Sequence, residues 1–263
     1  KYAKNVIFTT LTSLFYKINL SYDRKFDLHT NTNLFYDLKL GYKSSNTLAI
    51  NEIMQGSRVL DIGCGPGNFA RELQKKSCIV AGIDKYEPEG KKIFENFYQW
   101  DEAKNIIIHN VDTYNYILLL DSIEHLSKPE KFLDNLRRIS KTTKPKFIIT
   151  TGNVAFFITR LQLFIGNFNY GKRGILDLTH SRLYTFKTLR RLFEQCRYKI
   201  EKLQGIPAPF PKAMGLNLFS KILLFINDFL IVISKGLFWY QIFMVGTPTP
   251  TVEAILTNSL YIS

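Results

Sequence analysis

Val59-Leu60-Asp61-Ile62-Gly63-Cys64-Gly65-Pro66-Gly67-Asn68-Phe69-Ala70 is the stretch that decides the fold of this chain. An apolar segment (57–60) runs into an acid and a glycine-rich turn, and a helical pattern (68–75) follows. Glycine has no Cβ, so such a turn can adopt positive φ and let a ligand approach the backbone. In α/β folds, ligands bind where a parallel strand ends in this kind of turn. The stretch predicts an α/β fold with a nucleotide-type site.

The spacing of the glycines indicates which ligand binds. The dinucleotide pattern Gly-x-Gly-x-x-Gly places a pyrophosphate at the helix N-terminus, whereas this loop reads Asp-x-Gly-x-Gly-x-Gly. S-adenosylmethionine carries an ammonium instead of a phosphate, and Asp61 at the strand end suits that charge. We therefore expect S-adenosylmethionine rather than NAD, with a purely structural turn as the alternative. The predicted contacts in the loop are Asp61, Gly63, Cys64, Gly65 and Gly67.

Further acids follow the next predicted strands. Asp84 ends the apolar segment 78–83 and lies 17 residues beyond Gly67. That is near the spacing of about 20 residues expected of an acid that binds ribose hydroxyls. Asp84 and the following Lys85 are predicted cofactor contacts. Asp101, after segment 94–100, is the predicted contact of the adenine amino group. Asp112 is the alternative, because residues 106–108 are also strand-like.

The fourth predicted strand (116–120) runs into Asp121-Ser122-Ile123-Glu124-His125-Leu126. With residues 59–70 and 80–84, this segment resembles class I S-adenosylmethionine-dependent methyltransferases. The Asp-x-x-Glu-His-Leu ending is similar to the branch that holds ubiquinone-type O-methyltransferases and the methyltransferase-11/12/23 group. The resemblance implies an S-adenosylmethionine site that includes Asp121.

A second string, in residues 151–155 and 160–185, is similar to a bacterial subgroup found near, or fused to, glycosyltransferases. Thr151-Gly152-Asn153-Val154-Ala155 and Asp177-Leu178-Thr179-His180-Ser181-Arg182-Leu183-Tyr184-Thr185 belong to it. The substrates of that subgroup are mostly unassigned. The resemblance covers residues 45–250 and specifies the fold and the cofactor, but not the methyl acceptor.

The chain has 263 residues, of which 46% are hydrophobic, enough for one sizeable α/β domain. We expect a Rossmann-like, seven-stranded, mostly parallel sheet with helices on both faces. The expected parts are an N-terminal cap (1–45), a methyltransferase domain (46–250) with insertions 153–184 and 205–237, and a C-terminal tail (251–263). The remaining predicted elements are helices at 45–54 and 186–196, a helix from Pro129, strands at 146–151, 198–203 and 238–245, and short strands at 6–10 and 34–40.

Composition also bears on location and partners. Cys64, Cys78 and Cys196 have no paired or metal-binding spacing, so reduced thiols in a cytoplasmic protein are expected. No signal peptide is recognised, and because the first residue is not Met, an upstream segment is left open. The net charge of +13 fits an anionic membrane surface, a phosphorylated substrate or nucleic acid. Nucleic acid is disfavoured, because the motif after the fourth strand differs from that of base N-methyltransferases.

The second insertion contains an apolar run (216–237) that Lys221, Asp228 and Lys235 interrupt. A transmembrane helix needs about 20 mostly apolar residues, so this run is not predicted to span a bilayer. It is expected either to pack as a lid or dimer helix, or to lie at a membrane interface and admit a lipid acceptor. The oligomeric state stays open.

Methyl transfer to oxygen needs an aligned acceptor and a base that removes its proton. His125 and His180 are the candidate bases, with Asp121 beside them; helix capping and loop ordering are the structural alternatives. Arg182 is expected to bind an anionic substrate group or to pair with Asp177. The candidate substrate contacts are Asn153, Tyr170, Asp177, Arg182 and Tyr184.

The resemblance raises a metal option as well. In ubiquinone-type enzymes, two carboxylates and a histidine at positions matching Asp121, Glu124 and His125 bind a divalent cation. Asp121 is shorter than the usual Glu, and we expect no metal, with Mg²⁺ as the minor alternative. The predicted function is S-adenosylmethionine-dependent O-methylation of a small-molecule, sugar or lipid-linked acceptor. The alternatives are a non-catalytic scaffold for a glycosyltransferase, a NAD-dependent oxidoreductase and a nucleic-acid methyltransferase.

Overall fold

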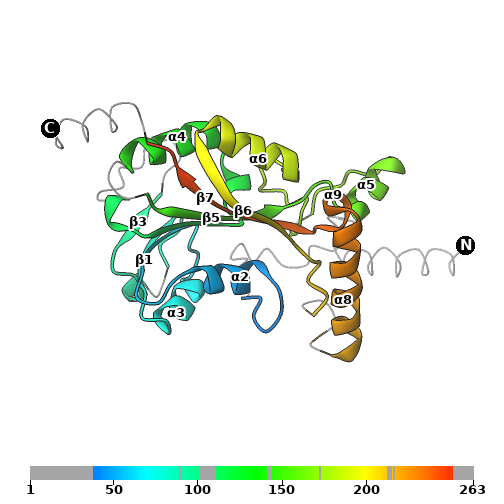
Figure 1. The fold of residues 1–263 in the computed structure, drawn as a ribbon, viewed down its shortest axis with the longest axis horizontal. Helices are drawn as coiled ribbons and strands as arrows, with labels where there is room; N and C mark the ends of the chain where they lie inside the picture. Colours follow the sequence, from blue (N-terminus) through cyan, green and yellow to red (C-terminus); the bar gives the residue numbers. More distant parts are fainter. Residues whose placement is uncertain are drawn as a thin grey trace, which may run out of the picture.

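A seven-stranded sheet forms the centre of the molecule (Figure 1). The computed structural model describes residues 38–88, 91–100, 111–140, 144–171, 173–211, 215 and 217–250. The strand order is β3-β2-β1-β4-β5-β7-β6, and every pair from β3 to β5 is parallel. The strands are β1 Arg58–Ile62, β2 Ile79–Asp84, β3 Phe97–Gln99, β4 Tyr116–Leu120, β5 Lys146–Gly152, β6 Tyr198–Ile206 and β7 Gln241–Pro248. The predicted Rossmann-like, mostly parallel sheet is confirmed.

Helices cover both faces of this sheet, and each face has its own apolar core (Figure 1). Leu133 of α4 and Phe193 of α6 pack on one face, while Ala49 of α2 and Leu73 of α3 pack on the other. The helices are α2 Ser45–Glu52, α3 Asn68–Gln74, α4 Pro129–Ile139, α5 Phe157–Phe164, α6 Phe186–Gln195, α8 Leu218–Ile233 and α9 Lys235–Phe238. Short 3-10 turns are η2 Lys91–Ile93, η3 Val111–Thr113 and η4 Ile123–His125.

Local sequence explains where the helices begin. Pro129 occupies the first turn of α4, where its missing N–H costs no hydrogen bond. α6 begins with a reciprocal capping box, in which the Thr185 hydroxyl accepts from the Thr188 N–H and the Thr188 hydroxyl accepts from the Thr185 N–H. These helix starts match the sequence predictions.

Other predicted boundaries differ from the structure. β7 was expected from residue 238 but begins at Gln241, because Lys235–Phe238 forms the short helix α9. β6 was expected to end at residue 203 but continues to Ile206, because it pairs with β7 past an irregularity at Ile200/Lys202. The predicted strands at 6–10 and 106–108, and Asp101, lie outside the described residues. Of segment 34–40 only residues 38–40 are described, and they form no strand.

The direction of strand β7 determines which of its residues lies at the carboxyl ends of the parallel strands. This strand lies between β5 and β6 and runs opposite to both. Its first residue, Gln241, therefore pairs with Gly152, the last residue of β5. The first residue of β7 thus lies beside the carboxyl ends of the parallel strands, where ligands bind in such folds.

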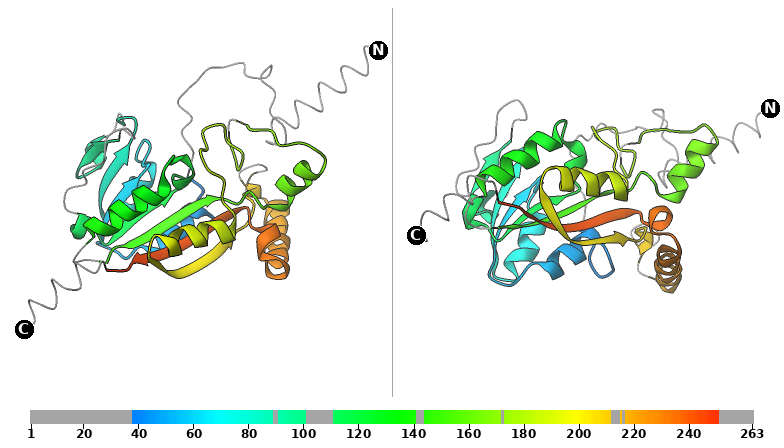
Figure 2. Two further views of the ribbon diagram at one scale, coloured as in Figure 1. Left: turned by 90° about the horizontal axis from the view of Figure 1, so that it is seen from above. Right: turned by 45° about the horizontal axis from the view of Figure 1, so that its top comes forward.

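The two insertions supply the helices at one end of the molecule. α5 belongs to the first insertion, and α8 and α9 belong to the second. Both further views keep these three helices together, beyond the end of the sheet (Figure 2). The ring centres of Phe157 in α5 and Phe238 in α9 are 5.6 Å apart, so these two helices are in direct contact.

Candidate functional site

The loop between β1 and α3 is shaped by three glycines with positive φ. Gly63, Gly65 and Gly67 have φ values of 81°, 53° and 82°. At Gly63 a Cβ would lie 2.3 Å from Ser122 Oγ, so only glycine fits against the end of β4. At Gly65 a Cβ would meet nothing within 4 Å, so the backbone there borders open space. The Gly63 N–H donates to the Ile83 carbonyl at 2.8 Å and joins the loop to β2.

Two acids flank this loop. Asp84, at the end of β2, accepts hydrogen bonds from the Gly65 N–H at 2.8 Å and the Tyr86 N–H at 3.0 Å. Asp61 in β1 is buried, with 3% of its surface exposed. Burial, and secondarily the nearby charge of Asp84, raises the pKa of Asp61 to about 7. The site thus holds an acid that a cation would stabilise in its ionised form.

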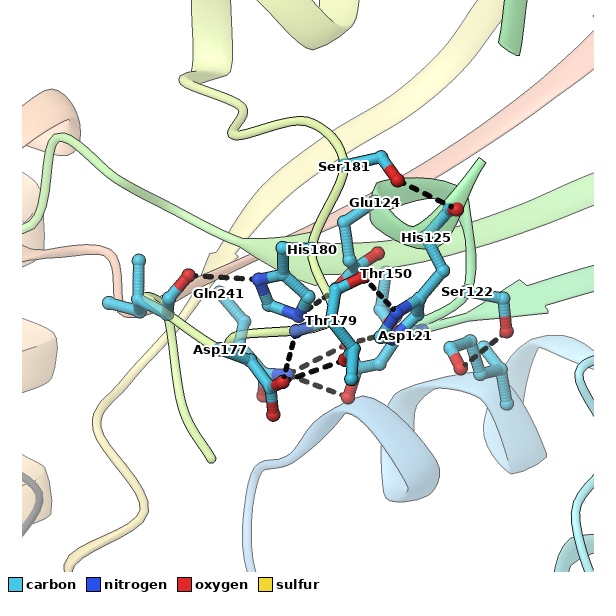
Figure 3. Close-up of polar contacts among 12 residues, drawn as sticks. Asp121, Ser122, Glu124, His125, Thr150, Asp177, Thr179, His180, Ser181 and Gln241 are labelled. Carbon is cyan, nitrogen blue, oxygen red and sulfur yellow. Dashed lines mark hydrogen bonds and ion pairs between the residues drawn. The ribbon is translucent and has the colours of Figure 1, made fainter. Parts of the chain in front are cut away.

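Asp121, directly after β4, is the centre of a polar network (Figure 3). It adopts a positive φ of 51°, which is uncommon for a residue with a side chain. Its carboxylate accepts hydrogen bonds from Thr150 Oγ1 and Gln241 Nε2, each at 2.9 Å. Lys39 Nζ lies 3.7 Å from Asp121 Oδ2. These contacts hold the Asp121 side chain at the carboxyl edge of the sheet.

Glu124, His125 and His180 form a second group next to Asp121 (Figure 3). The rings of the two histidines are 4.9 Å apart, and His180 Nε2 lies 4.0 Å from Glu124 Oε1. The Nδ1 atom of His180 lies 3.0 Å from the Ile175 carbonyl, and that of His125 lies 3.1 Å from the Thr179 carbonyl. A carbonyl can only accept, so both Nδ1 atoms carry hydrogen, and in the neutral rings Nε2 has the lone pair.

Burial shifts the pKa values of Glu124 and His180 in opposite directions. It raises the pKa of Glu124 to about 8, and the charge of Asp121 adds to the effect. Burial, followed by the neighbouring His125, lowers the pKa of His180. Near pH 7, Glu124 is therefore mostly protonated and His180 neutral. Among the described residues, Glu124 Oε2 has no hydrogen-bond partner.

Comparisons with known proteins show the family of this chain. Residues 39–203 match the model of a family described as a methyltransferase domain. The chain belongs to this family. The methyltransferase is 28% identical over 131 residues to a ubiquinone biosynthesis O-methyltransferase of Aliivibrio fischeri, covering 43% of this chain and 51% of the relative. A protein of the same description from Coxiella burnetii is 26% identical over 106 residues, covering 37% and 44%. The chain thus spans about half the length of the curated relatives it matches.

Solved structures show the same fold. An S-adenosylmethionine-dependent methyltransferase of Thermotoga maritima superposes with a TM-score of 0.51 at 15% identity, covering 78% of this chain and 88% of that one. Another, from Methanosarcina mazei, gives a TM-score of 0.50 at 14% identity, covering 78% and 98%. The prediction of a class I S-adenosylmethionine-dependent methyltransferase is confirmed at the level of family and fold.

The loop of the methyltransferase fits the cofactor of its class. S-adenosylmethionine carries a cationic ammonium and sulfonium and no phosphate, and the loop presents two acids, Asp61 and Asp84. The space over Gly65 is where a Cβ would otherwise stand, so the backbone can approach a ligand closely. Lys85 lies next to this loop, with its Nζ 5.6 Å from the Tyr86 ring centre. Asp112, the alternative adenine contact, lies in η3.

The first cysteine of the methyltransferase lies inside the loop. Burial raises the pKa of the Cys64 thiol above its ordinary value, with the charges of Asp61 and Asp84 adding to the effect. Cys64, Cys78 and Cys196 are all buried free thiols.

The candidate substrate residues of the methyltransferase occupy different environments. Asn153 is fully buried, and its amide donates to the Trp239 carbonyl at 2.7 Å, so it joins β5 to the start of β7. Asp177 accepts from the Thr179 N–H and hydroxyl and orders the loop before His180. Arg182 is half-exposed and pairs with Glu130 at 2.5 Å.

The two tyrosines differ from each other. Tyr170 is partly exposed, and its ring lies 5.8 Å from Phe168. Tyr184 is buried, and in the described part of the chain its hydroxyl has no hydrogen-bond partner. Burial raises the pKa of Tyr184 far above its ordinary value. Tyr184 thus belongs to the apolar core on one face of the sheet.

The metal alternative concerned Asp121, Glu124 and His125. Across the described ranges, no group of three or more His, Cys, Asp or Glu side chains is arranged to hold a metal ion. Each of the three also has other contacts: Asp121 binds Gln241, Glu124 is buried near His180, and His125 binds the Thr179 carbonyl.

Sequence reasoning missed three partners of Asp121. Thr150 lies near the end of β5, Lys39 precedes α2 and Gln241 begins β7. One signal was present: Gln241 is a polar residue at the head of the apolar run Ile242-Phe243-Met244-Val245. An amide in that position needs a polar partner when it is buried.

Proposed function

We propose that this chain transfers a methyl group from S-adenosylmethionine to an oxygen atom of a small-molecule, sugar or lipid-linked acceptor. One observation carries the proposal: the acidic glycine loop and the Glu124–His125–His180 group follow β1 and β4, which are adjacent parallel strands. The two parts therefore share the carboxyl edge of the sheet. The cofactor, when bound, supplies an activated methyl group on a sulfonium.

The chain's own residues hold the donor. Asp61 would face the ammonium group, and Asp84 would bind the ribose hydroxyls, while Gly63, Gly65 and Gly67 let the backbone approach. Asp101 remains the proposed adenine contact. The protein gains rate chiefly by keeping donor and acceptor aligned in a site that excludes water.

A base on the acceptor side favours oxygen as the methylated atom. An alcohol or phenol attacks much faster once its proton is removed. His125 is exposed, and its Nδ1–H donates to the Thr179 carbonyl, so the ring is oriented and Nε2 can accept a proton. We assign the base role to His125, with His180 packed against it and Asp121 close by. The matched relatives, named as O-methyltransferases, also favour oxygen.

Calorimetry with S-adenosylmethionine and S-adenosylhomocysteine tests the donor half. Wild type should bind both, and Asp84→Ala should weaken binding at least about tenfold, the effect of one lost charge-assisted hydrogen bond. Asp134→Ala, an aspartate on α4, is the matched control and should bind normally. If wild type binds neither ligand, the proposal is wrong.

Turnover tests the acceptor half. S-adenosylhomocysteine release should be measured with fractionated metabolite and glycolipid extracts, and the product analysed by mass spectrometry. A methyl ether or ester is expected. Binding without turnover in every fraction would indicate a non-catalytic module, and a methylated nitrogen or carbon would contradict the choice of oxygen.

A further inference from the structure

Helix α8 exposes one continuous apolar face. Its members are each 46–77% exposed, and they recur every three or four residues, which places them on one side of the helix. They are Leu218, Ile222, Phe225, Ile226, Phe229, Val232 and Ile233. Within the described residues, no helix is long and apolar enough to cross a membrane. Because its apolar side chains share one side of the helix, α8 suits contact with a surface.

Helix α5 adds a second exposed apolar group at the same end of the molecule (Figures 1 and 2). Leu161 and Leu163 are each 58% exposed, and Phe164 and Ile165 are 87% and 63% exposed. Phe157 connects this helix to α9 through its ring contact with Phe238. We call the two groups together the α5–α8 apolar face. Exposed apolar groups of this extent usually mark an interaction site.

The opposite side of α8 is attached to the domain. Asn227 is buried; its Oδ1 accepts from the Ala208 N–H at 2.8 Å, and its Nδ2 donates to the Phe238 carbonyl at 3.1 Å. A capping box of Asn217 and Ser220 starts the helix. These contacts determine the rotation of α8 about its axis, so the apolar face is held outward.

The charge of the segments that carry this face indicates its partner. The sequences of the two insertions (153–184 and 205–237), which carry both helices, contain seven basic residues and two acids. Of these basic residues, Arg160 and Lys221 are exposed in the structure. One of the two acids, Asp228 on α8, pairs with Lys43 at 2.6 Å. Exposed apolar side chains on segments with an excess of basic residues match the interface of an anionic bilayer. At such an interface the apolar side chains insert among the lipids, and the basic side chains contact the phosphates.

We propose that the α5–α8 apolar face binds the interface of an anionic lipid bilayer without spanning it. A second copy of the chain is a poorer occupant, because self-association through this face would bring two excesses of positive charge together. The inference is independent of methyl transfer, since docking requires neither donor nor acceptor.

Vesicle flotation of the full chain tests the proposal. Wild type should float with vesicles of phosphatidylcholine and phosphatidylglycerol, bind much less to phosphatidylcholine alone, and lose binding as salt is raised. The double substitution Phe225→Ser and Phe229→Ser should lower partitioning by roughly tenfold for each phenylalanine. Met54→Ser is the matched control, because Met54 is 70% exposed but lies outside the face, and it should float like wild type.

Circular dichroism establishes that the variants remain folded, as expected for exposed positions. The proposal is overturned if wild type does not float with anionic vesicles, or if the double variant floats equally well. Sedimentation gives the third test. A wild-type dimer that Phe225→Ser and Phe229→Ser convert to monomer would show that a second copy covers the face, and would also overturn the proposal.

Discussion

His180 Nε2 lies 4.0 Å from Glu124 Oε1, and the two side chains are only 8% and 3% exposed. Hydrogen bonding of His180 Nδ1 to the Ile175 carbonyl leaves Nε2 as the lone-pair atom in the neutral ring. Because burial raises the pKa of Glu124 and lowers that of His180, the uncharged forms meet near neutral pH. A buried carboxylic acid opposite a buried neutral imidazole is thus a part of this fold that responds to pH.

Glu124→Gln should make the stability of the protein less dependent on pH. The unfolded chain ionises Glu124 near its ordinary pKa of 4.5, whereas the folded chain holds the proton up to about pH 8. The free energy of unfolding therefore falls as pH rises between these values, and the loss is complete above about pH 8. Glutamine removes this loss, so the variant should gain about 1–3 kcal/mol over wild type at pH 8 and little at pH 4.

Denaturant unfolding at several pH values measures this effect. Glu130→Gln is the control, because Glu130 is half-exposed and pairs with Arg182 at the surface. Its curve should stay parallel to that of wild type. Some slope will remain in Glu124→Gln because the pKa of Asp61 is also raised. A Glu124→Gln curve parallel to wild type at all pH values would contradict the assignment.

His125→Gln should slow turnover about 100-fold or more without weakening S-adenosylmethionine binding, because it removes the proposed base and leaves the loop intact. Single-turnover rates with an active acceptor fraction, together with calorimetry, separate the two effects. Ser181→Ala is the local control, since its hydroxyl donates to the His125 main-chain carbonyl at 3.3 Å and not to the imidazole, and the rate should stay near wild type. A His125→Gln rate equal to wild type would transfer the base role to another group.

Gly65→Ala should abolish most cofactor binding, whereas Gly56→Ala should preserve it. Both glycines have positive φ, and in both a Cβ would meet nothing within 4 Å, so each substitution should cost a similar stability of about 1–2 kcal/mol. Only Gly65 lies in the loop where the donor is proposed to approach the backbone. Calorimetry should show an affinity at least about tenfold lower for Gly65→Ala alone. Equal affinities in the two variants would move the cofactor away from this loop.

The affinity for S-adenosylmethionine should rise with pH up to about 7. The pKa of Asp61 is about 7 in the free protein, and a bound cation would lower it, so binding releases a proton. Above about pH 7 the affinity should level off. Asp61→Asn should bind more weakly and without this dependence. Calorimetry in buffers of different ionisation enthalpy measures the number of protons released on binding. A wild-type affinity that is constant from about pH 5.5 to about pH 7.5 would contradict the release of a proton from Asp61.

Local patterns in the sequence predict most of the sheet. β4 was expected at residues 116–120, and Tyr116–Leu120 is the observed strand, because a continuous apolar run ends there in a polar turn. Strand ends set by pairing are harder to predict. β3 is limited to Phe97–Gln99 because η2 and a bend occupy residues 91–96, and β6 is extended by its ladder with β7.

The candidate site was predictable where its residues are close in sequence. The glycine loop and Asp84 are adjacent to single strands, so their positions follow from the strand pattern. The contact of Gln241 with Asp121 spans 120 positions and depends on β7 running antiparallel beside β5. The burial of Glu124 likewise depends on packing between η4 and the end of β5, which no local pattern specifies.

Asn227 connects helix α8 to the segment that leads to Asp121. It bonds to the Phe238 carbonyl, and Gln241, three residues further on, holds Asp121 through two hydrogen bonds of 2.9 Å. A short series of hydrogen bonds and chain segments therefore connects α8 to the end of β4. Detergent or lipid bound to α8 lies one hydrogen bond, that of Asn227 with the Phe238 carbonyl, from the segment that leads into β7. Assays of this chain should therefore state which detergent or lipid is present, as they state the substrate concentration.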